Sequence, residues 1–402
     1  MGSADDLSIV LVTLERGSDA VVLLRSDGKE ARMPLGSSVF EPTSLISRVS
    51  YSPTFEGLIA ETLQGDSIVF ELPRFDGADQ RAGRLVVYLD QNKWRLVSDA
   101  IQGRPGVSAH ERAAALRLAG WSEQRKIILP VSSGHLYETT KWSNSDGRYR
   151  LGLTILQFSR GWQLADPLQV WEDELRGTLC DAKARDEEFA QAVTLAPNTL
   201  HSPTARGYVP APSPADFPAE LAFQHEALVS AVTQIDTMLD SELGQRGPDT
   251  GWAAANQRFS DELDSPGGDS QQKRKKIDAR LVEDLRGMVA AVSASAGSTK
   301  AQQNWEADSQ PALKLVPLPA LGLLREMFHE RHLNRGTKWE PNDVIDMVYL
   351  SCAAGYADFV VCERHMRESL ARGVRRLGRK TQVYRNLAET VAAIETVIDT
   401  TE

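Results

Sequence analysis

The chain has 402 residues, of which 42% are hydrophobic and 25% are charged, a composition typical of a globular protein with two or three domains. It contains no apolar run long enough to cross a bilayer, and its first residues lack the basic and apolar regions of a signal peptide, so we expect no membrane span and no export. The cysteines Cys180, Cys352 and Cys362 are too scattered for a disulfide framework, which predicts a reducing, cytoplasmic location.

The formal charge of −10 argues against a protein whose whole surface binds nucleic acid. One segment differs, because residues 364–380 carry seven Arg or Lys side chains against one Glu. The pattern indicates either a local surface for a polyanion or a solvated helix face, and both interpretations stay open.

Residues 1–80 predict a small all-β module. Short β-branched runs occur at 7–14, 20–26 and 66–72, and Asp27-Gly28 lies where a hairpin turn is expected. We interpret this module as structural or as a docking site for a protein partner, with a nucleic-acid-binding barrel as the alternative.

From residue 84 the pattern changes to alternating strands and helices. The continuous apolar run that ends at Leu89 predicts a buried strand of a parallel sheet. Ser108 and Glu111 have the spacing of a capping box, and we expect the helix that they begin to stop at Gly120. With a strand at 126–132 and a helix after it, the segment forms a βαβα unit.

Residues 166–317 predict a large helical insertion with mobile loops. The stretch 193–219 is rich in Pro, Ser and Thr and is expected to be a surface loop, and a helix is expected at 220–243. We interpret the basic run at 273–276 as a solvated helix start.

The α/β pattern returns at residues 318–402, with a helix, a second helix opened by Asp343 and Asp346, a buried strand at 357–361, and a final short strand and helix. The apolar face expected on the second helix comprises Ile345, Val348, Tyr349 and Cys352.

Acidic residues lie at corresponding points of this layer: Asp90 and Glu363 each follow a strand, and Glu138 lies early in a helix. Because the carboxyl ends of parallel strands share one edge, we expect several of these acids to converge there. Converging carboxylates repel one another, so a hard divalent cation is the expected partner. Taken singly, each acid also fits a helix cap or an exposed helix position.

Three segments together resemble a PIN-like nuclease domain, namely VVYLDQNKW at 86–94, LPVSSGHLYET at 129–139 and NDVIDMVYLSCAAGYADFVVCER at 342–364. The similarity is to the bacterial type whose first strand ends in a Leu-Asp-x-Asn-x-Trp pattern, and it covers 84–165 and most of 318–402. It implies a three-layer α/β/α sandwich with a central, mainly parallel sheet, interrupted by the insertion.

The resemblance also implies a site. Its active-site acids would be Asp90, Glu138, Asp346 and Glu363, with Asp343 as the extra acid of a D-x-x-D variant, and together they would hold Mg²⁺ or Mn²⁺. Two features depart from the family pattern. Glu363 follows Cys362 where Asp after Thr is common, and Glu138 and Asp346 are 208 positions apart, far more than a compact PIN domain needs.

The implied function is metal-dependent hydrolysis of phosphodiester bonds in RNA, or less favourably in single-stranded DNA. Asn92 would contact a water or a phosphate, and the backbone would bind to Arg364, Arg367 and Arg372. We expect Trp94 to be a core residue and His135 to be structural.

Two other functions fit the same residues. One is a catalytically weak PIN-like interaction protein of a defence or toxin-like system, and the other is a phosphohydrolase of small nucleotides. A protein partner or a second copy of the chain would bind through the N-terminal module or the insertion.

Overall fold

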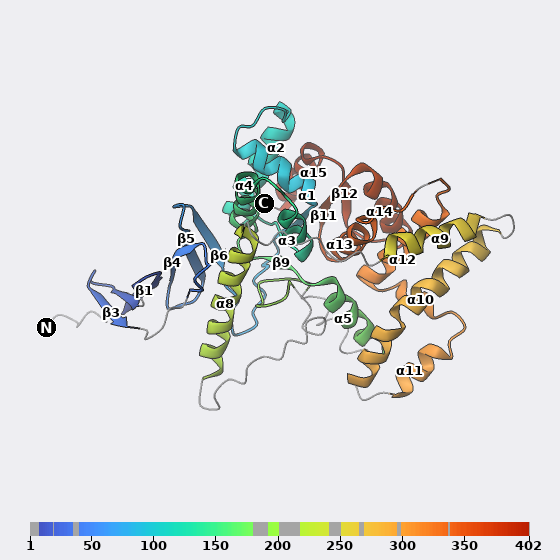
Figure 1. Ribbon diagram of the computed structural model, residues 1–402, viewed down its shortest axis with the longest axis horizontal. Coiled ribbons are helices and arrows are strands. Elements are labelled where there is room, and N and C mark those ends of the chain that lie inside the picture. Colours follow the sequence, from blue (N-terminus) through green and yellow to red (C-terminus); the bar gives the residue numbers. More distant parts are fainter. Residues whose placement is uncertain are drawn as a thin grey trace.

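The computed structural model describes residues 8–18, 20–34, 40–179, 192–200, 218–240, 251–264, 269–295, 299–336 and 338–401. Within these ranges the chain is a mixed α/β protein with an antiparallel N-terminal sheet, a parallel sheet and a two-stranded ribbon (Figure 1). The predictions of an α/β class and of an N-terminal all-β segment are therefore confirmed. None of the described helices is long and apolar enough to cross a membrane.

The N-terminal sheet is antiparallel throughout and has the strand order β3-β2-β1-β4-β5-β6. Its strands are β1 (Ile9–Glu15), β2 (Ala20–Arg25), β3 (Glu30–Pro34), β4 (Ile46–Tyr51), β5 (Gly57–Thr62) and β6 (Ser67–Glu71). The predicted turn at Asp27-Gly28 joins β2 to β3, and Gly28 adopts a φ of +79°, which favours glycine. The exposed edge strand β3 carries Arg32 and Pro34, which oppose pairing with another chain.

The second sheet is parallel and has the order β12-β11-β7-β8. Its strands are β7 (Leu85–Leu89), β8 (Ile127–Ile128), β11 (Phe359–Val361) and β12 (Gln382–Tyr384). The chain passes from β7 to β8 on one side and enters β11 on the other side, so the strand order reverses between β7 and β11. In open α/β sheets, ligands bind in the crevice at such a reversal.

Helices cover both faces of the parallel sheet (Figure 1). One side holds α1 (Gln91–Ile101), α2 (Ala109–Glu123), α4 (Ser145–Ser159) and α15 (Leu387–Thr401); the other holds α5 (Pro167–Leu179), α12 (Pro319–Leu333), α13 (Asp343–Tyr356) and α14 (Arg364–Arg376). Strand β7 serves both cores, because Val87 and Leu89 pack on the first side and Val86 and Tyr88 on the second. The layers are therefore helix, sheet and helix.

The N-terminal sheet shares a core with the α/β layers. It packs against α4 and α8 (Ala219–Leu239), and its residues Leu58 and Phe70 lie in the same buried cluster as Leu89. Glu71, at the end of β6, forms buried ion pairs with Arg84 at 3.1 Å and Arg160 at 3.4 Å. The module is thus attached by apolar packing and buried charge as well as by the connecting chain.

The segment predicted as an insertion is mainly helical where it is described, and it begins with α5. It contains, besides α8, the elements α9 (Trp252–Asp264), α10 (Ser270–Ser295), α11 (Thr299–Glu306), a 3₁₀ helix (Pro311–Leu315) and β10 (Val193–Thr194), which pairs with β9 (Gln163–Leu164). Most of the predicted loop at 193–219, and Cys180, fall outside the described residues. In the basic run, Arg274 lies 2.9 Å from Nδ1 of His329 on α12, so the prediction of a merely solvated run is wrong there.

Two local predictions need correction. Helix α2 continues past Gly120 to Glu123, because this last turn carries the buried residues Trp121 and Ser122. Ser108 caps α2 as predicted. The carboxylate of Glu111, however, accepts hydrogen bonds from the backbone N–H groups at the start of α15, 3.1 and 3.3 Å away, where we expected a capping box.

The buried face of α13 also differs from the predicted one. Ile345, Val348 and Tyr349 are only half-buried, whereas Val344 and Met347 are buried. The helix packs against α12 as well as against the sheet, so a wider face is covered than the sequence pattern indicated.

A buried carboxylate joins the insertion to the C-terminal part of the domain. Glu174 of α5 has no exposed surface, and its oxygens accept hydrogen bonds from the backbone N–H groups of Ala320 (2.6 Å) and Leu321 (2.9 Å) and from the hydroxyl of Tyr356 (2.8 Å). These N–H groups lie in the first turn of α12, where the helix itself offers no acceptor. Burial raises the pKa of Glu174 to about 7 despite these donors.

We expect Glu174→Gln to lower the free energy of unfolding by about 2 kcal/mol, because an amide nitrogen cannot accept from a helix N–H. Urea denaturation followed by circular dichroism measures this change. Glu123→Gln, at an exposed position of α2, is the matched control and should leave the stability nearly unchanged. Equal stability of the two variants would show that Glu174 does not anchor α12.

Candidate active site

The strands β7 and β11 lie side by side, and each leads into an acidic N-cap residue, β7 directly into Asp90 and β11 into Glu363 after Cys362. Asp90 precedes α1, and Glu363 occupies the N-cap position of α14. The backbone N–H of Asp90 donates to the carbonyl of Val361 at 2.9 Å, so the parallel pairing extends to the acid itself. Both acids therefore lie at the carboxyl edge of the parallel sheet, as the sequence predicted, and the structure places them at the reversal of strand order.

Asp90 is held in place by its role as a helix cap. Its Oδ1 accepts a hydrogen bond of 2.8 Å from the backbone N–H of Gln91. Burial raises the pKa of Asp90, and the charge of Glu363 raises it further, while the N–H of Gln91 acts in the opposite direction. Asp90 therefore caps α1 although burial and the charge of Glu363 disfavour its ionised form.

Helix α3 (Ser133–Thr140), which carries Glu138, is fixed against the end of β7. Nε2 of His135 lies 2.8 Å from the carbonyl oxygen of Leu89, and its Nδ1 accepts from the backbone N–H of Ser132 at 3.0 Å. The imidazole therefore carries its proton on Nε2, and burial lowers its pKa to about 3. Gln91 adds a hydrogen bond of 2.9 Å to Thr139, which ties α1 to α3.

Helix α13, which carries Asp346, approaches α3 closely. A Cβ atom on Gly134 would lie 3.0 Å from the ring of Tyr349, so only glycine allows this approach without a shift. The hydroxyl groups of Ser133 and Tyr349 are hydrogen-bonded at 2.8 Å. These contacts place Asp346 within electrostatic reach of Glu138.

Four of the five predicted acids, Asp90, Glu138, Asp346 and Glu363, are electrostatically coupled; we call them the acid group. Burial, followed by the charge of Asp90, raises the pKa of Glu138 to about 7 and that of Asp346 to about 8. Neither these two residues nor Asp90 forms an ion pair with Arg or Lys within the described part of the chain. The group therefore has an excess of negative potential, and within it Glu138 and Asp346 hold protons near neutral pH.

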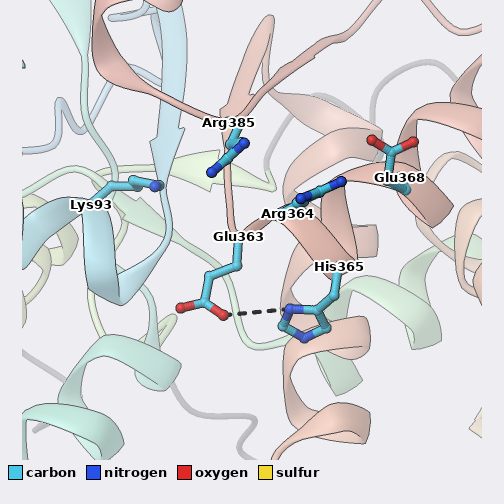
Figure 2. A pocket seen from close by; sticks show the side chains of 6 residues that line it. All are labelled: Lys93, Glu363, Arg364, His365, Glu368 and Arg385. Atoms are coloured by element: carbon cyan, nitrogen blue, oxygen red, sulfur yellow. Dashed lines mark ion pairs between the residues drawn. The ribbon is translucent and has the colours of Figure 1, made fainter. Parts of the chain in front are cut away.

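The longer side chain of Glu363 reaches toward α1. The amide of Asn92 donates to its Oε1, and Nδ1 of His365 lies 3.5 Å from its Oε2 (Figure 2). In this structure Asn92 therefore contacts the acid group itself, a partner that we did not expect from the sequence.

The charge of Asp343 also raises the pKa of Asp346, but Asp343 has a different environment from the acid group. It is 4% exposed and accepts hydrogen bonds from the guanidinium of Arg331 and from the backbone N–H of Glu340 at 2.6 Å. Arg331 also lies over the ring of Trp339, whose indole N–H donates to Ser260 of α9 at 2.9 Å. Asp343 thus has its own cation and fixes the start of α13.

The three arginines predicted to bind substrate do not all lie at one site in the structure. Arg364 lines an open surface pocket of about 500 Å³ beside Glu363, together with Lys93 and Arg385 (Figure 2). Arg367 pairs with Glu368 at 3.3 Å and Arg372 with Glu330 at 2.7 Å, and neither lines this pocket.

Sequence reasoning missed Lys93 and Arg385. Each lies shortly after the carboxyl end of a parallel strand, Lys93 after β7 and Arg385 directly after β12. The rule that placed Asp90 and Glu363 at this edge would have identified these cations as well.

In the described part of the chain, the side chains of the acid group are not arranged as a metal site. Among the described residues, no three His, Cys, Asp or Glu side chains form a group that could hold a metal ion. The structure shows a set of half-buried carboxylates whose charges interact with one another.

Comparison with protein-family models, curated proteins and solved structures finds no match to this chain. The interpretation of the site therefore depends on the geometry and charge of its own residues.

The raised pKa values make a prediction for stability. Native Glu138 and Asp346 bind protons up to about pH 7 and 8, whereas ordinary values are 4.5 and 3.8, so stability falls as pH rises through this range. Glu138→Gln and Asp346→Asn should each raise the free energy of unfolding at pH 8.5 by roughly 1–3 kcal/mol and change it little at pH 4. Thermal unfolding in EDTA measures the difference, and a gain that is independent of pH would contradict its electrostatic origin.

For a substitution of Asp343, on the same helix, we expect the opposite change in stability. Asp343→Asn leaves the half-buried cation of Arg331 without a carboxylate, so we expect a loss of about 3 kcal/mol at pH 8.5, where Asp346→Asn stabilises. The two variants form a matched pair in one unfolding assay. A change of the same sign in both would show that the two aspartates do not have separate roles.

Proposed function

We propose that residues 84–165 and 318–402 form a PIN-like domain and that the protein is a metal-dependent nuclease acting on RNA in preference to DNA. The observation that carries this proposal is the convergence of Asp90, Glu138, Asp346 and Glu363 from four separate elements at the reversal of strand order. The three sequence segments that resemble PIN-like domains support it. The free thiols of Cys352 and Cys362 support a reducing, cytoplasmic setting.

The donor set fits Mg²⁺ or Mn²⁺ in its chemistry. All four side chains are carboxylates, the oxygen ligands that hard divalent cations prefer, and their mutual repulsion is the kind of energy that a cation offsets. Asp90, Glu138 and Asp346 would hold the ion, with Glu363 completing the site. When bound, such an ion lowers the pKa of a water and stabilises negative charge on a phosphate.

The protein's own residues prepare this site in two ways. Asn92 orients Glu363, and the backbone N–H groups of Gln91 and Glu363 both stabilise the ionised form of Asp90. Glu138 and Asp346 must lose protons before they can act as ligands, so affinity for a divalent ion is expected to increase with pH.

Two side chains near the site have structural roles. His135 uses both ring nitrogens for backbone contacts and is neutral, so it is not available as a general base. Trp94 has no exposed surface and is a core residue, as the sequence predicted.

A phosphohydrolase of small nucleotides is the second candidate, and one observation favours it. The pocket beside Glu363, about 500 Å³, lies within the range of roughly 300–1,000 Å³ that is usual for small-ligand sites. The two reactions use the same acids and differ in the size of the substrate.

The experiment is cleavage of labelled single-stranded RNA and DNA, and of mononucleotides, with Mn²⁺, Mg²⁺ or EDTA. We expect metal-dependent cutting of RNA that increases from pH 6.5 to 8.5 and that falls about a hundredfold or more in Asp90→Asn and Glu138→Gln. The exposed Glu123→Gln variant is the control. Turnover of mononucleotides alone would indicate the phosphohydrolase. No turnover and no thermal shift with Mn²⁺ would reject both enzymes in favour of an interaction protein.

A further inference from the structure

Three cations from separate elements surround the pocket beside the acid group. Lys93 lies in the first turn of α1, Arg364 begins α14, and Arg385 follows β12. Figure 2 shows Lys93 and Arg385 extending into the same space, with Glu363 between them and His365. Chain segments that are distant in the sequence thus bring positive charge to one point of the surface.

The three cations lie near carboxylates, and the charge of Lys93 acts to lower the pKa of Asp90. Among the described residues, none of the three forms an ion pair, whereas the neighbouring Arg372 of α14 pairs with Glu330. Two carboxylates also line the pocket: Glu368 pairs with Arg367, whereas Glu363 is hydrogen-bonded to the neutral amide of Asn92 and keeps its charge, so the lining has three cations and two carboxylates. Like charges around one hollow repel one another, and a bound anion would remove that cost.

The backbone adds to this positive field. Glu363 occupies the N-cap position of α14 but makes no capping hydrogen bond through its side chain. The N–H groups of the first turn, which includes Arg364 and His365, therefore lack the acceptor that a capping side chain would supply. A helix N-terminus favours anions, and phosphate oxygens in particular.

We propose that Lys93, Arg364 and Arg385 form a phosphate-binding subsite that holds a phosphate group of the substrate strand next to the acid group. The identity of the substrate rests on the proposed nuclease function, whereas the binding of phosphate does not. The pocket is open, and every residue that lines it has an ionisable side chain, which suits a charged group on a longer chain. Arg and Lys together supply both the fork-shaped and the point-like donors that phosphate accepts.

The test measures binding separately from cleavage. Fluorescence anisotropy in EDTA follows short single-stranded RNA and DNA carrying either a 5′-phosphate or a 5′-hydroxyl, with inorganic phosphate as competitor. We expect Lys93→Gln and Arg385→Gln each to weaken binding about tenfold. Each should also make the dependence of log K on log salt shallower by about 1. Lys275→Gln, an exposed cation of α10 outside the pocket, should bind like the parent.

The possible outcomes distinguish a failure of the phosphate-binding subsite from a failure of the proposed nuclease function. Parental affinity and salt dependence in the Lys93→Gln/Arg385→Gln double variant, with parental thermal stability, would overturn the subsite whether or not the parent cleaves RNA. Loss of binding in the double variant without any cleavage by the parent would support the subsite and reject the nuclease. Tighter binding of the 5′-phosphorylated strand assigns the pocket to a terminal phosphate, and equal binding assigns it to an internal phosphodiester.

Discussion

The parallel pairing of β7 with β11 is the interaction on which the site depends. It brings Asn92 into contact with Glu363, 271 positions away in the sequence, and it is fixed at both ends. At one end Asp358 accepts from the backbone N–H of Val86 at 2.8 Å, and at the other Asp90 donates its N–H to Val361. A shift of register would therefore break these contacts and, at the same time, move Asp90 away from Glu363.

This arrangement has an energetic cost that the packing has to offset. Half-buried carboxylates that raise one another's pKa destabilise the fold as they ionise, and the three cations beside them repel one another as well. Among the described residues, the acid group and these three cations lie close together without forming ion pairs, although the charge of Lys93 acts to lower the pKa of Asp90. Unsatisfied charge of both signs is typical of sites where binding energy, rather than folding energy, completes the electrostatics.

The sequence predicted those features that depend on local chemistry. A continuous apolar run indicates a buried strand wherever the rest of the chain lies, and an acid within two residues of the end of such a strand lies at the sheet edge, so the positions of Asp90 and Glu363 were predictable. Asp343 and Asp346 could not be distinguished in this way. They are three residues apart at one helix start, and only the tertiary contact with Arg331 separates them. Glu111 likewise caps α15, a partner that no local pattern indicates.

The contacts of the insertion give a structural reason for the long segment between Glu138 and Asp346. Helix α10 contributes Leu281, Leu285 and Val289 to the same core as the sheet residue Val360, so the insertion is part of the domain interior. Through Ser260 and Trp339, α9 also supports the ion pair of Arg331 with Asp343. Because that ion pair fixes the start of α13, the position of Asp346 depends on residues of the insertion. A segment that looks like an addition to a compact fold thereby becomes one of the supports of its acid group.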